Sequence, residues 1–442
     1  MMFAAYNLAL LAVSPLIVGY LLYRIFVSRK SRTSWRQQLG GVRLPAGIAH
    51  RDRIWIHAVS VGESVASAAV VTEIKASLPE TAVVVSTTTT TGQEMAHKSV
   101  NDADAIIYFP FDLIPSALRS LRAVRPVVFA CTDTEIWPNF LHLARARGVK
   151  TAMVNGTISD RTLRGAARVP WLYRWALSNI DRFCMQSQAD ADRVIAMGAD
   201  PARVSVTGNC KADQSGGPMA PEEARRLKAS LGIPGDAPVF VAGSSNPGED
   251  EPVMDAFLSA RAAHPELRLI IAPRQIERAQ EVERIADDKN LSCARRSRPD
   301  DAPRDWDVLI LDTFGELADV YAVADVTFVG GSLIPRGCHS ILQPLAQGKP
   351  VFFGPHTFKA KDLVAQAKAA GVGFEVRDGG ELGAAIARML GDRATLDSIR
   401  IRCGEMMQAN RGASKRTAEA LVELYYQALA VKGGSNGRAK VS

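Results

Sequence analysis

Short runs of apolar and β-branched residues alternate with helix-length segments along most of the chain, and this alternation restricts its fold more than any other feature. A strand that is covered by helices on both faces is a continuous apolar run, because neither of its faces meets water. A first set of runs lies at 53–61, 81–89, 105–109, 126–132, 150–155, 182–187 and 204–208. A second set lies at 238–244, 267–273, 307–313, 326–332, 350–356 and 371–376.

A polar stretch that contains glycine and proline, 214–226, separates the two sets. The pattern therefore predicts an α/β protein with two Rossmann-like doubly wound domains, at 31–215 and at 216–430 with the C-terminal helices, and a disordered tail at 431–442. A chain of 442 residues exceeds one ordinary core, and its 47% hydrophobic residues suffice for two. In such folds ligands bind beyond the carboxyl ends of the strands.

The first 23 residues carry no charge, and as a helix they would cover the roughly 30 Å hydrocarbon core of a bilayer. No acidic residue occurs before Asp52. Five basic residues follow the uncharged segment: Arg24, Arg29, Lys30, Arg32 and Arg36. This bias predicts a single-pass anchor with its basic flank at 1–30, a body on the cytoplasmic face of the inner membrane, and attraction to anionic lipid. The alternatives are a cleavable signal peptide and a re-entrant or interfacial helix around Pro15.

The net charge of +7 fits anionic partners, which include phospholipid, a phosphorylated substrate and nucleic acid. Nucleic acid is disfavoured because the chain has no recognised nucleic-acid motif. The six cysteines have no metal-site spacing, and neither a P-loop nor a nucleophile elbow is present. These observations direct attention to acidic and glycine-rich turns at strand ends.

Two acidic turns follow strands of the first predicted domain. In HAVSVGE (57–63), Glu63 lies on the turn into a helix, where a carboxylate can take a proton from an attacking hydroxyl. The Ser60–Glu63 spacing also fits a capping box, which would give Glu63 a purely structural role. TDTEIWPN (132–139) carries Asp133 and Glu135, which are catalytic candidates or ordinary helix-start residues.

Two turns of the second predicted domain suit a phosphate. VTFVGGSLIPRG (326–337) runs from a strand into a glycine loop, where backbone amides of Gly331 and Ser332 can approach an anion. A plain strand-to-helix turn explains the same residues. Arg274, in APRQIER (272–278), follows another strand of this domain and can pair with a phosphate or read a base.

Taken in order, these motifs resemble the bacterial 3-deoxy-D-manno-octulosonic acid (Kdo) transferase family. The resemblance extends to about Asp362, and its carriers are VSVGE (59–63), TTTTTG (87–92), TEIWPN (134–139), TGNCKAD (207–213), PRQIER (273–278), GELADVYAVADVTFVGGSL (315–333) and GPHTF (354–358). It implies a GT-B fold whose first domain binds the acceptor and whose second binds the nucleotide sugar. It also implies inverting, metal-independent transfer of Kdo from CMP-Kdo to a lipid A precursor, with no further cofactor.

The resemblance also assigns residues. Glu63 corresponds to the family's proposed general base, and Glu135 is the second catalytic acid. The implied donor contacts are Arg274, Gly315, Glu316, Gly331, Ser332, Ser340 and Gln343, and the implied acceptor contacts are Ser60, Gly62, Thr91 and Lys211. Ser340 and Gln343 stand where the family usually has an asparagine and a glutamate.

Two other functions fit the same sequence. One is a related transferase that uses another nucleotide sugar or another lipid acceptor, which the departures at Ser340 and Gln343 would suit. The other is a catalytically weak, membrane-bound scaffold within an envelope-synthesis complex. Transfer of label from CMP-Kdo into a lipid A precursor separates both from a Kdo transferase.

Overall fold

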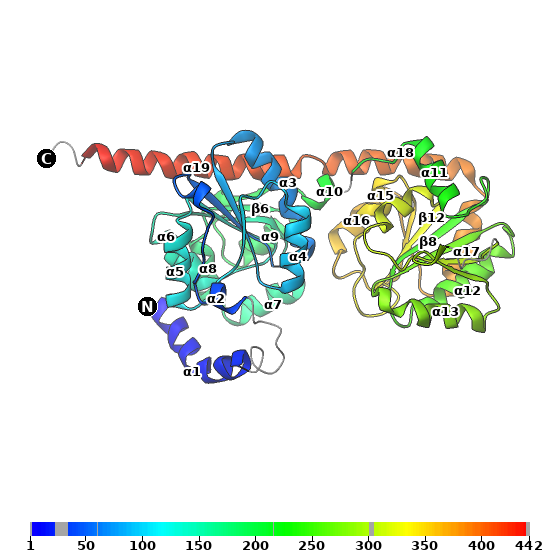
Figure 1. Ribbon diagram of the computed structural model, residues 1–442, viewed down its shortest axis with the longest axis horizontal. Helices are drawn as coiled ribbons and strands as arrows, with labels where there is room; N and C mark the ends of the chain where they lie inside the picture. Colours follow the sequence, from blue (N-terminus) through cyan, green and yellow to red (C-terminus); the bar gives the residue numbers. More distant parts are fainter. Residues whose placement is uncertain (1, 23–33, 60, 215, 300–304, 439–442) are drawn as a thin grey trace. The chain divides into compact units, whose positions relative to one another are not determined.

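The computed structural model describes residues 2–22, 34–59, 61–214, 216–299 and 305–438. The chain forms two compact units, one comprising Met1–Gln214 with Arg411–Ser442 and the other Ser215–Asn410. Figure 1 shows that each unit is a sheet flanked by helices on both faces. The predicted fold class, two Rossmann-like doubly wound α/β domains, is confirmed.

The sheet of the first unit has the order β3-β2-β1-β4-β5-β6-β7, and its neighbouring strands are parallel. Its strands are β1 (Arg53–His57), β2 (Ala82–Thr87), β3 (Ala105–Tyr108), β4 (Val128–Thr132), β5 (Lys150–Gly156), β6 (Arg182–Met185) and β7 (Val204–Val206). The direction of strand addition reverses between β1 and β4. Ligands of open α/β sheets bind beyond the carboxyl ends of the strands at such a switch point.

The sheet of the second unit has the order β10-β11-β9-β8-β12-β13-β14 and is also parallel. Its strands are β8 (Val239–Ser245), β9 (Arg268–Pro273), β10 (Cys293–Arg295), β11 (Val308–Ile310), β12 (Val326–Val329), β13 (Val351–Phe353) and β14 (Gly373–Glu375). Each predicted apolar run contains one strand. The edge strand β10 was missed, because Cys-Ala-Arg has no β-branched or aromatic residue. The switch point of this sheet lies between β8 and β12.

Two apolar layers enclose the first sheet. Residues of α3, α4 and α19 pack with Ile54 and Ile56, whereas residues of α5 to α9 pack with Trp55. The sides alternate because successive side chains of a strand point to opposite faces. The helices are α2 (Trp35–Gln38), α3 (Val61–Ser77), α4 (Thr90–Ser99), α5 (Ile114–Val124), α6 (Pro138–Arg145), α7 (Asp160–Arg168), α8 (Pro170–Ser178), α9 (Gln188–Ala196), α10 (Lys211–Gln214) and α19 (Ala413–Arg438). β1 is buried along its whole length, which fixes the loop that follows it.

The second sheet is enclosed in the same way. Residues of α12, α13 and α17 cover one face, and residues of α11, α14 and the neighbouring 3-10 helix cover the other. The helices are α11 (Pro221–Ser230), α12 (Asp250–Arg261), α13 (Ala279–Asp288), α14 (Leu317–Val320), α15 (Leu342–Ala346), α16 (Lys361–Ala369), α17 (Gly379–Leu390) and α18 (Arg393–Asn410). The 3-10 helices within the described residues are η2 (Ala46–Ile48), η3 (Pro201–Arg203), η4 (Ile276–Arg278) and η6 (Tyr321–Val323).

The last helix belongs to the first unit, which corrects the expectation that both C-terminal helices complete the second domain. The carboxylate of Asp213 accepts the backbone N–H groups of Gly412 and Ser414, both at 2.7 Å, at the start of α19. Leu421 and Leu424 are buried in the core of the first unit, so the apolar stripe of α19 explains its position. α19 also continues to Arg438, through much of the predicted disordered tail, because extending a formed helix costs little. Residues 439–442 lie outside the described residues.

The uncharged N-terminal segment forms α1 (Met2–Leu22). Within the described residues, no helix combines the length and hydropathy that a bilayer crossing requires. The predicted transmembrane anchor is therefore not supported, and the basic residues of its flank up to Arg32 lie outside the described residues.

The first turns of α1 instead contact the first unit. The Tyr6 hydroxyl donates to Asp112 at 3.0 Å, and the amides of Asn7 and Asn139 exchange hydrogen bonds of 2.8 and 2.9 Å. The Phe3 ring lies 4.5 Å from the ring of His142. The segment thus carries polar side chains whose hydrogen-bonding partners are in the protein.

Candidate active site

Glu63 lies near the start of α3, just beyond the carboxyl end of β1. Its side chain is 7% exposed, and Oε2 accepts hydrogen bonds from the Val59 N–H at 2.8 Å and the Thr132 hydroxyl at 2.9 Å. The capping alternative placed this carboxylate on the amide of Ser60, which lies outside the described residues. Since Thr132 ends β4, the carboxylate is held at the switch point of the first sheet.

The loop after β4 adds two carboxylates to Glu63. Burial and the negative charges of Glu63 and Asp133 raise the pKa of Glu135 to about 7. Burial also raises the pKa of Asp133 to about 6, where the charge of Glu63 adds to the effect and that of Lys211 opposes it. The three carboxylates therefore lie within electrostatic range of one another. Like charges that the fold holds together are typical of functional sites.

Backbone strain accompanies this cluster. Asp133 and Asn155 both have a φ of 51°, which side chains other than glycine rarely adopt and which costs on the order of 1 kcal/mol or more per residue. The Asn155 amide donates to Asp133 Oδ1 at 2.7 Å and its Oδ1 accepts the Cys210 N–H at 2.9 Å. The ammonium of Lys211 lies 3.9 Å from Asp133 Oδ2. The strained residues after β4 and near the end of β5 thus position one carboxylate and one cation.

Of the predicted acceptor residues, Ser60 lies outside the described residues, and Gly62, Thr91 and Lys211 lie around the same loop. A Cβ atom on Gly62 would stand 3.7 Å from the Lys211 ammonium, so these two residues are neighbours. Thr91 is exposed in the first turn of α4, where the Thr89 hydroxyl accepts the Gly92 N–H at 3.0 Å. A Cβ on Gly92 would lie 2.8 Å from the Val59 carbonyl oxygen, so the threonine turn packs against the loop that holds Glu63.

The glycine loop of the second unit differs from the expectation. The backbone N–H groups of Gly331, Ser332 and Leu333 donate to the buried carboxylate of Glu249, at 2.6, 2.9 and 2.9 Å. The Asn246 N–H makes a fourth such bond at 3.0 Å. The amides of Gly331 and Ser332 were predicted to face a phosphate, and this prediction is wrong because an internal anion occupies them.

Positive charge gathers beside this loop from two segments, which carry Arg274 and Lys359. Arg274 and Lys359 are exposed, and their charges add to burial in lowering the pKa of His339 to about 4. His339 Nε2 lies 3.3 Å from the Asn246 amide, and a Cβ on Gly331 would stand 3.1 Å from the His339 ring. Gly331 therefore makes room for His339. Arg274 was predicted from the sequence, whereas Lys359 and His339 were not assigned to the site.

The other predicted donor residues do not form one cluster with Arg274. Gly315 has a φ of 90° and open space around its Cα. Glu316 accepts from Arg296 at 2.9 Å and from the Thr313 hydroxyl at 2.8 Å, and the Arg296 hydrogen bond lowers its pKa. Ser340 and Gln343 are exposed between β12 and the end of α15. Glu316 is thus already paired with a cation, and no hydrogen bond links these residues to Arg274.

Sequence reasoning missed two residues that organise the sites. Glu249 is three residues after Asn246, the spacing of a capping pair, and that signal was available in NPGE (246–249). Asn155 ends a strand in NGTIS (155–159), where only its tolerance of positive φ distinguishes it. Neither signal identifies the partner, which comes from a distant loop.

A model for the family described as 3-deoxy-D-manno-octulosonic-acid transferase (kdotransferase) matches residues 33–214. The 3-deoxy-D-manno-octulosonic acid transferase of Bordetella pertussis is 32% identical over 432 residues, which cover 94% of this chain and 98% of that protein. The chain belongs to the Kdo transferase family. Members of this family are glycosyltransferases, and the chain is an enzyme of that class. The motif resemblance read from the sequence is thereby confirmed.

Two other comparisons extend this result. A bifunctional glycosyltransferase/methyltransferase of Fusobacterium nucleatum is 31% identical over 365 residues, and the chain spans 56% of its length. A solved glycosyltransferase structure from Rickettsia africae matches 86% of this chain and 99% of its own, with a TM-score of 0.60 at 11% identity. The second likeness concerns the fold alone. It agrees with the GT-B class that the Kdo transferase family implies.

Proposed function

We propose that this Kdo transferase moves Kdo from CMP-Kdo to a hydroxyl of a lipid A precursor in lipopolysaccharide biosynthesis, with inversion and without a metal ion. The observation that carries the proposal is the position of Glu63. Its carboxylate is oriented by Val59 and Thr132 at the switch point of the first sheet, where ligands of such folds bind. The names of the relatives in Bordetella pertussis and Haemophilus influenzae support the sugar.

In this mechanism Glu63 removes the proton of the acceptor hydroxyl as its oxygen attacks the anomeric carbon. The bond from that carbon to the CMP phosphate oxygen breaks, and the phosphate leaves with the bonding electrons. Arg274 and Lys359 are the exposed cations suited to stabilise the charge that develops there. One displacement inverts the anomeric centre, so no enzyme nucleophile is needed.

The remaining residues of the first unit have positioning roles in this proposal. Glu135, whose pKa is about 7, is largely neutral below that pH, which limits repulsion next to Glu63. Lys211, held near Asp133 and beside Gly62, offers a cation to an anionic acceptor. Thr91 presents a hydroxyl on the neighbouring turn.

We also propose that the enzyme works at the cytoplasmic face of the inner membrane, where a lipid acceptor is found. The uncharged segment at the N-terminus and the basic residues that follow it support membrane association. Fractionation of cells at low and high salt tests this: the enzyme should sediment with inner membrane, and salt should weaken the electrostatic part of the association.

Purified enzyme incubated with labelled CMP-Kdo and lipid A precursor tests the proposed reaction. Label should enter the lipid fraction, and the new linkage should have the anomeric configuration opposite to that of the donor. Transfer from another CMP-sugar in preference to CMP-Kdo would assign a different donor. CMP-Kdo binding without transfer to any lipid would favour the scaffold alternative and contradict the proposal.

A further inference from the structure

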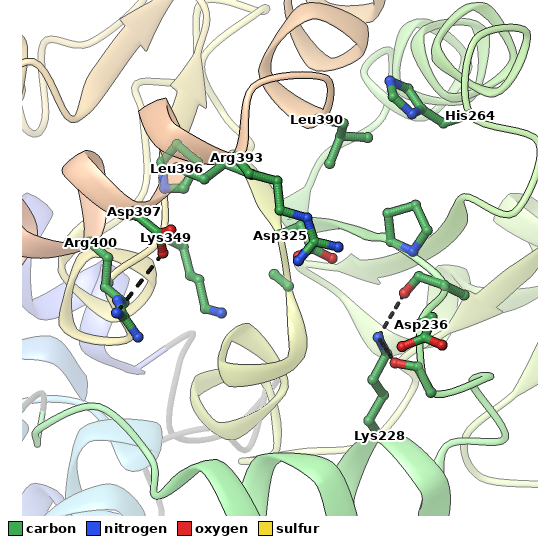
Figure 2. A pocket seen from close by; sticks show the side chains of 16 residues that line it. Lys228, Asp236, His264, Asp325, Lys349, Leu390, Arg393, Leu396, Asp397 and Arg400 are labelled. Atoms are coloured by element: carbon green, nitrogen blue, oxygen red, sulfur yellow. Dashed lines mark hydrogen bonds and ion pairs between the residues drawn. The ribbon is translucent and has the colours of Figure 1, made fainter.

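A cavity of about 440 Å³ lies in the second unit at the amino ends of its strands (Figure 2). Its wall includes the residues that lead into β8, β12 and β13, namely Pro238, Asp325 and Pro350, and it is completed by α11 and the start of α18. The sheet is parallel, so this edge is opposite to the carboxyl-end loops that carry Arg274 and Gly331. The cavity is therefore separate from the candidate donor site.

Four cationic side chains line this cavity, and they come from three parts of the unit: Lys228 from α11, Lys349 from the turn before β13, and Arg393 and Arg400 from α18. Figure 2 shows the Lys349 and Arg393 side chains extending from the α18 side toward the space that Lys228 approaches from α11. The Lys228 ammonium donates to the carbonyl oxygens of Gly235 and Ala237 at 2.9 and 2.7 Å. These two hydrogen bonds hold Lys228 at the rim of the cavity.

Two of the cations remain available to a ligand. Among the residues that the structure describes, neither the Lys349 ammonium nor the Arg393 guanidinium makes a hydrogen bond or an ion pair within 4 Å. Arg400 lies 3.9 Å from Asp397, which is a loose ion pair. Asp325, one of the acids in the lining, accepts the Val239 N–H at 2.8 Å and so is partly satisfied by the backbone.

The cations are close enough to repel one another. Burial lowers the pKa of Lys349, and the charges of Arg400 and Lys228 lower it further, whereas Asp325 opposes the change. The pKa of Lys228 is lowered by burial and by Arg393, against Asp325 and Asp236. Three carboxylates, those of Asp236, Asp325 and Asp397, line the same cavity, so its four cations leave one positive charge that an anionic ligand can balance.

We propose that this cavity binds a small phosphorylated anion, in which a phosphate or diphosphate group is held by Lys349 and Arg393. The guanidinium fork of arginine matches two phosphate oxygens at once, and lysine adds a point charge. The volume lies within the roughly 300–1,000 Å³ of small-molecule sites. Among the described residues that line the cavity, His264 is the one aromatic ring, and its Nε2 is tied to the Ala387 carbonyl at 2.9 Å, which favours a diphosphate or a sugar phosphate over a nucleotide.

Calorimetric titration of the full chain with pyrophosphate, in detergent and at fixed ionic strength, tests this site. CMP is present at saturation so that the donor site is blocked. We expect measurable binding that Lys349→Gln and Arg393→Gln each weaken roughly 10- to 100-fold, because each removes one charge-assisted contact. Arg377→Gln is the matched control, since Arg377 is 83% exposed in the same unit and pairs with Glu381.

Several outcomes overturn the proposal. They are no binding of either pyrophosphate or anionic vesicles, equal binding by all variants, or binding that is lost in Arg274→Gln and retained in Arg393→Gln. Thermal melting of each variant separates lost binding from lost folding, and Arg393→Gln is the safer variant because Arg393 is exposed whereas Lys349 is half-buried. Vesicles with and without phosphatidylglycerol form a second arm: vesicle binding that depends on Arg393, without pyrophosphate binding, would identify a lipid headgroup as the source of the phosphate.

Discussion

The two units place an acidic residue at the same point of the same topology, and they use it differently. Glu63 follows β1 and Glu249 follows β8, each beside the switch point of its sheet. Glu249 is fully buried and accepts four backbone N–H groups, so its charge is balanced by the fold. Glu63 accepts the Val59 N–H and the Thr132 hydroxyl, and two other carboxylates lie near it. A carboxylate whose charge is balanced by backbone amides stabilises a loop, whereas a carboxylate that the fold holds beside other carboxylates is a candidate for catalysis.

The largest effect is expected for Glu63→Gln, which keeps the shape of the side chain and removes the base. Transfer of Kdo should fall about 10²- to 10⁴-fold, and thermal melting should change little because glutamine can still accept the Val59 N–H. Initial rates with labelled CMP-Kdo measure it. Glu94→Gln, an exposed acid on α4 of the same unit, is the matched control. Full activity of Glu63→Gln would show that Glu63 is not the catalytic base and that it does not differ from Glu249 in this respect.

Glu249→Gln should instead destabilise the second unit, by about 3–5 kcal/mol, because an amide group would face backbone donors and leave some unsatisfied. Hydrogen exchange followed by mass spectrometry separates the units: peptides of β8 and β12 should exchange faster, and those of β1 should not change. Glu251→Gln, exposed two residues further along α12, provides the control. Unchanged protection of β12 would show that Glu249 does not hold the glycine loop.

The pH dependence of stability sharpens the comparison further. The pKa of Glu135 is raised from 4.5 to about 7, so between these values the folded chain binds more protons than the unfolded chain, and stability falls as the pH rises through this window. Glu135→Gln removes this pH-dependent loss of stability. Between pH 5 and pH 8, its free energy of unfolding should therefore rise by about 1–3 kcal/mol relative to that of the parent protein. Urea unfolding at both pH values measures the gain, and an equal effect at pH 5 and pH 8 would contradict the charge crowding.

The smallest effect is expected for metal removal. If base and cation residues supply the chemistry, EDTA should leave the initial rate of transfer unchanged, and added Mg²⁺ should not increase it. Loss of activity in EDTA that Mg²⁺ restores would show that the carboxylates around Glu63 act with a cation instead.

Prediction from the sequence succeeded where the signal is local. Continuous apolar runs marked each strand except β10, and HAVSVGE placed Glu63 on the turn after β1. It failed where the partner is distant in the chain. Gly331 and Ser332 were predicted to form a phosphate loop because nothing near them in sequence supplies an anion. Their amides are instead occupied by Glu249, which precedes them by 82 and 83 residues.

The sequence by itself determined the two doubly wound domains, the strands and helices, and the residue types at the strand ends, because burial on both faces of a strand is written in consecutive residues. Only the tertiary structure decided that Asp133 and Glu135 gather near Glu63, that Glu249 occupies the amides of the glycine loop, and that α19 returns to the first unit. These arrangements depend on strand order and on contacts across long stretches of chain. Their energies come from charges and hydrogen bonds between groups that no local pattern brings together.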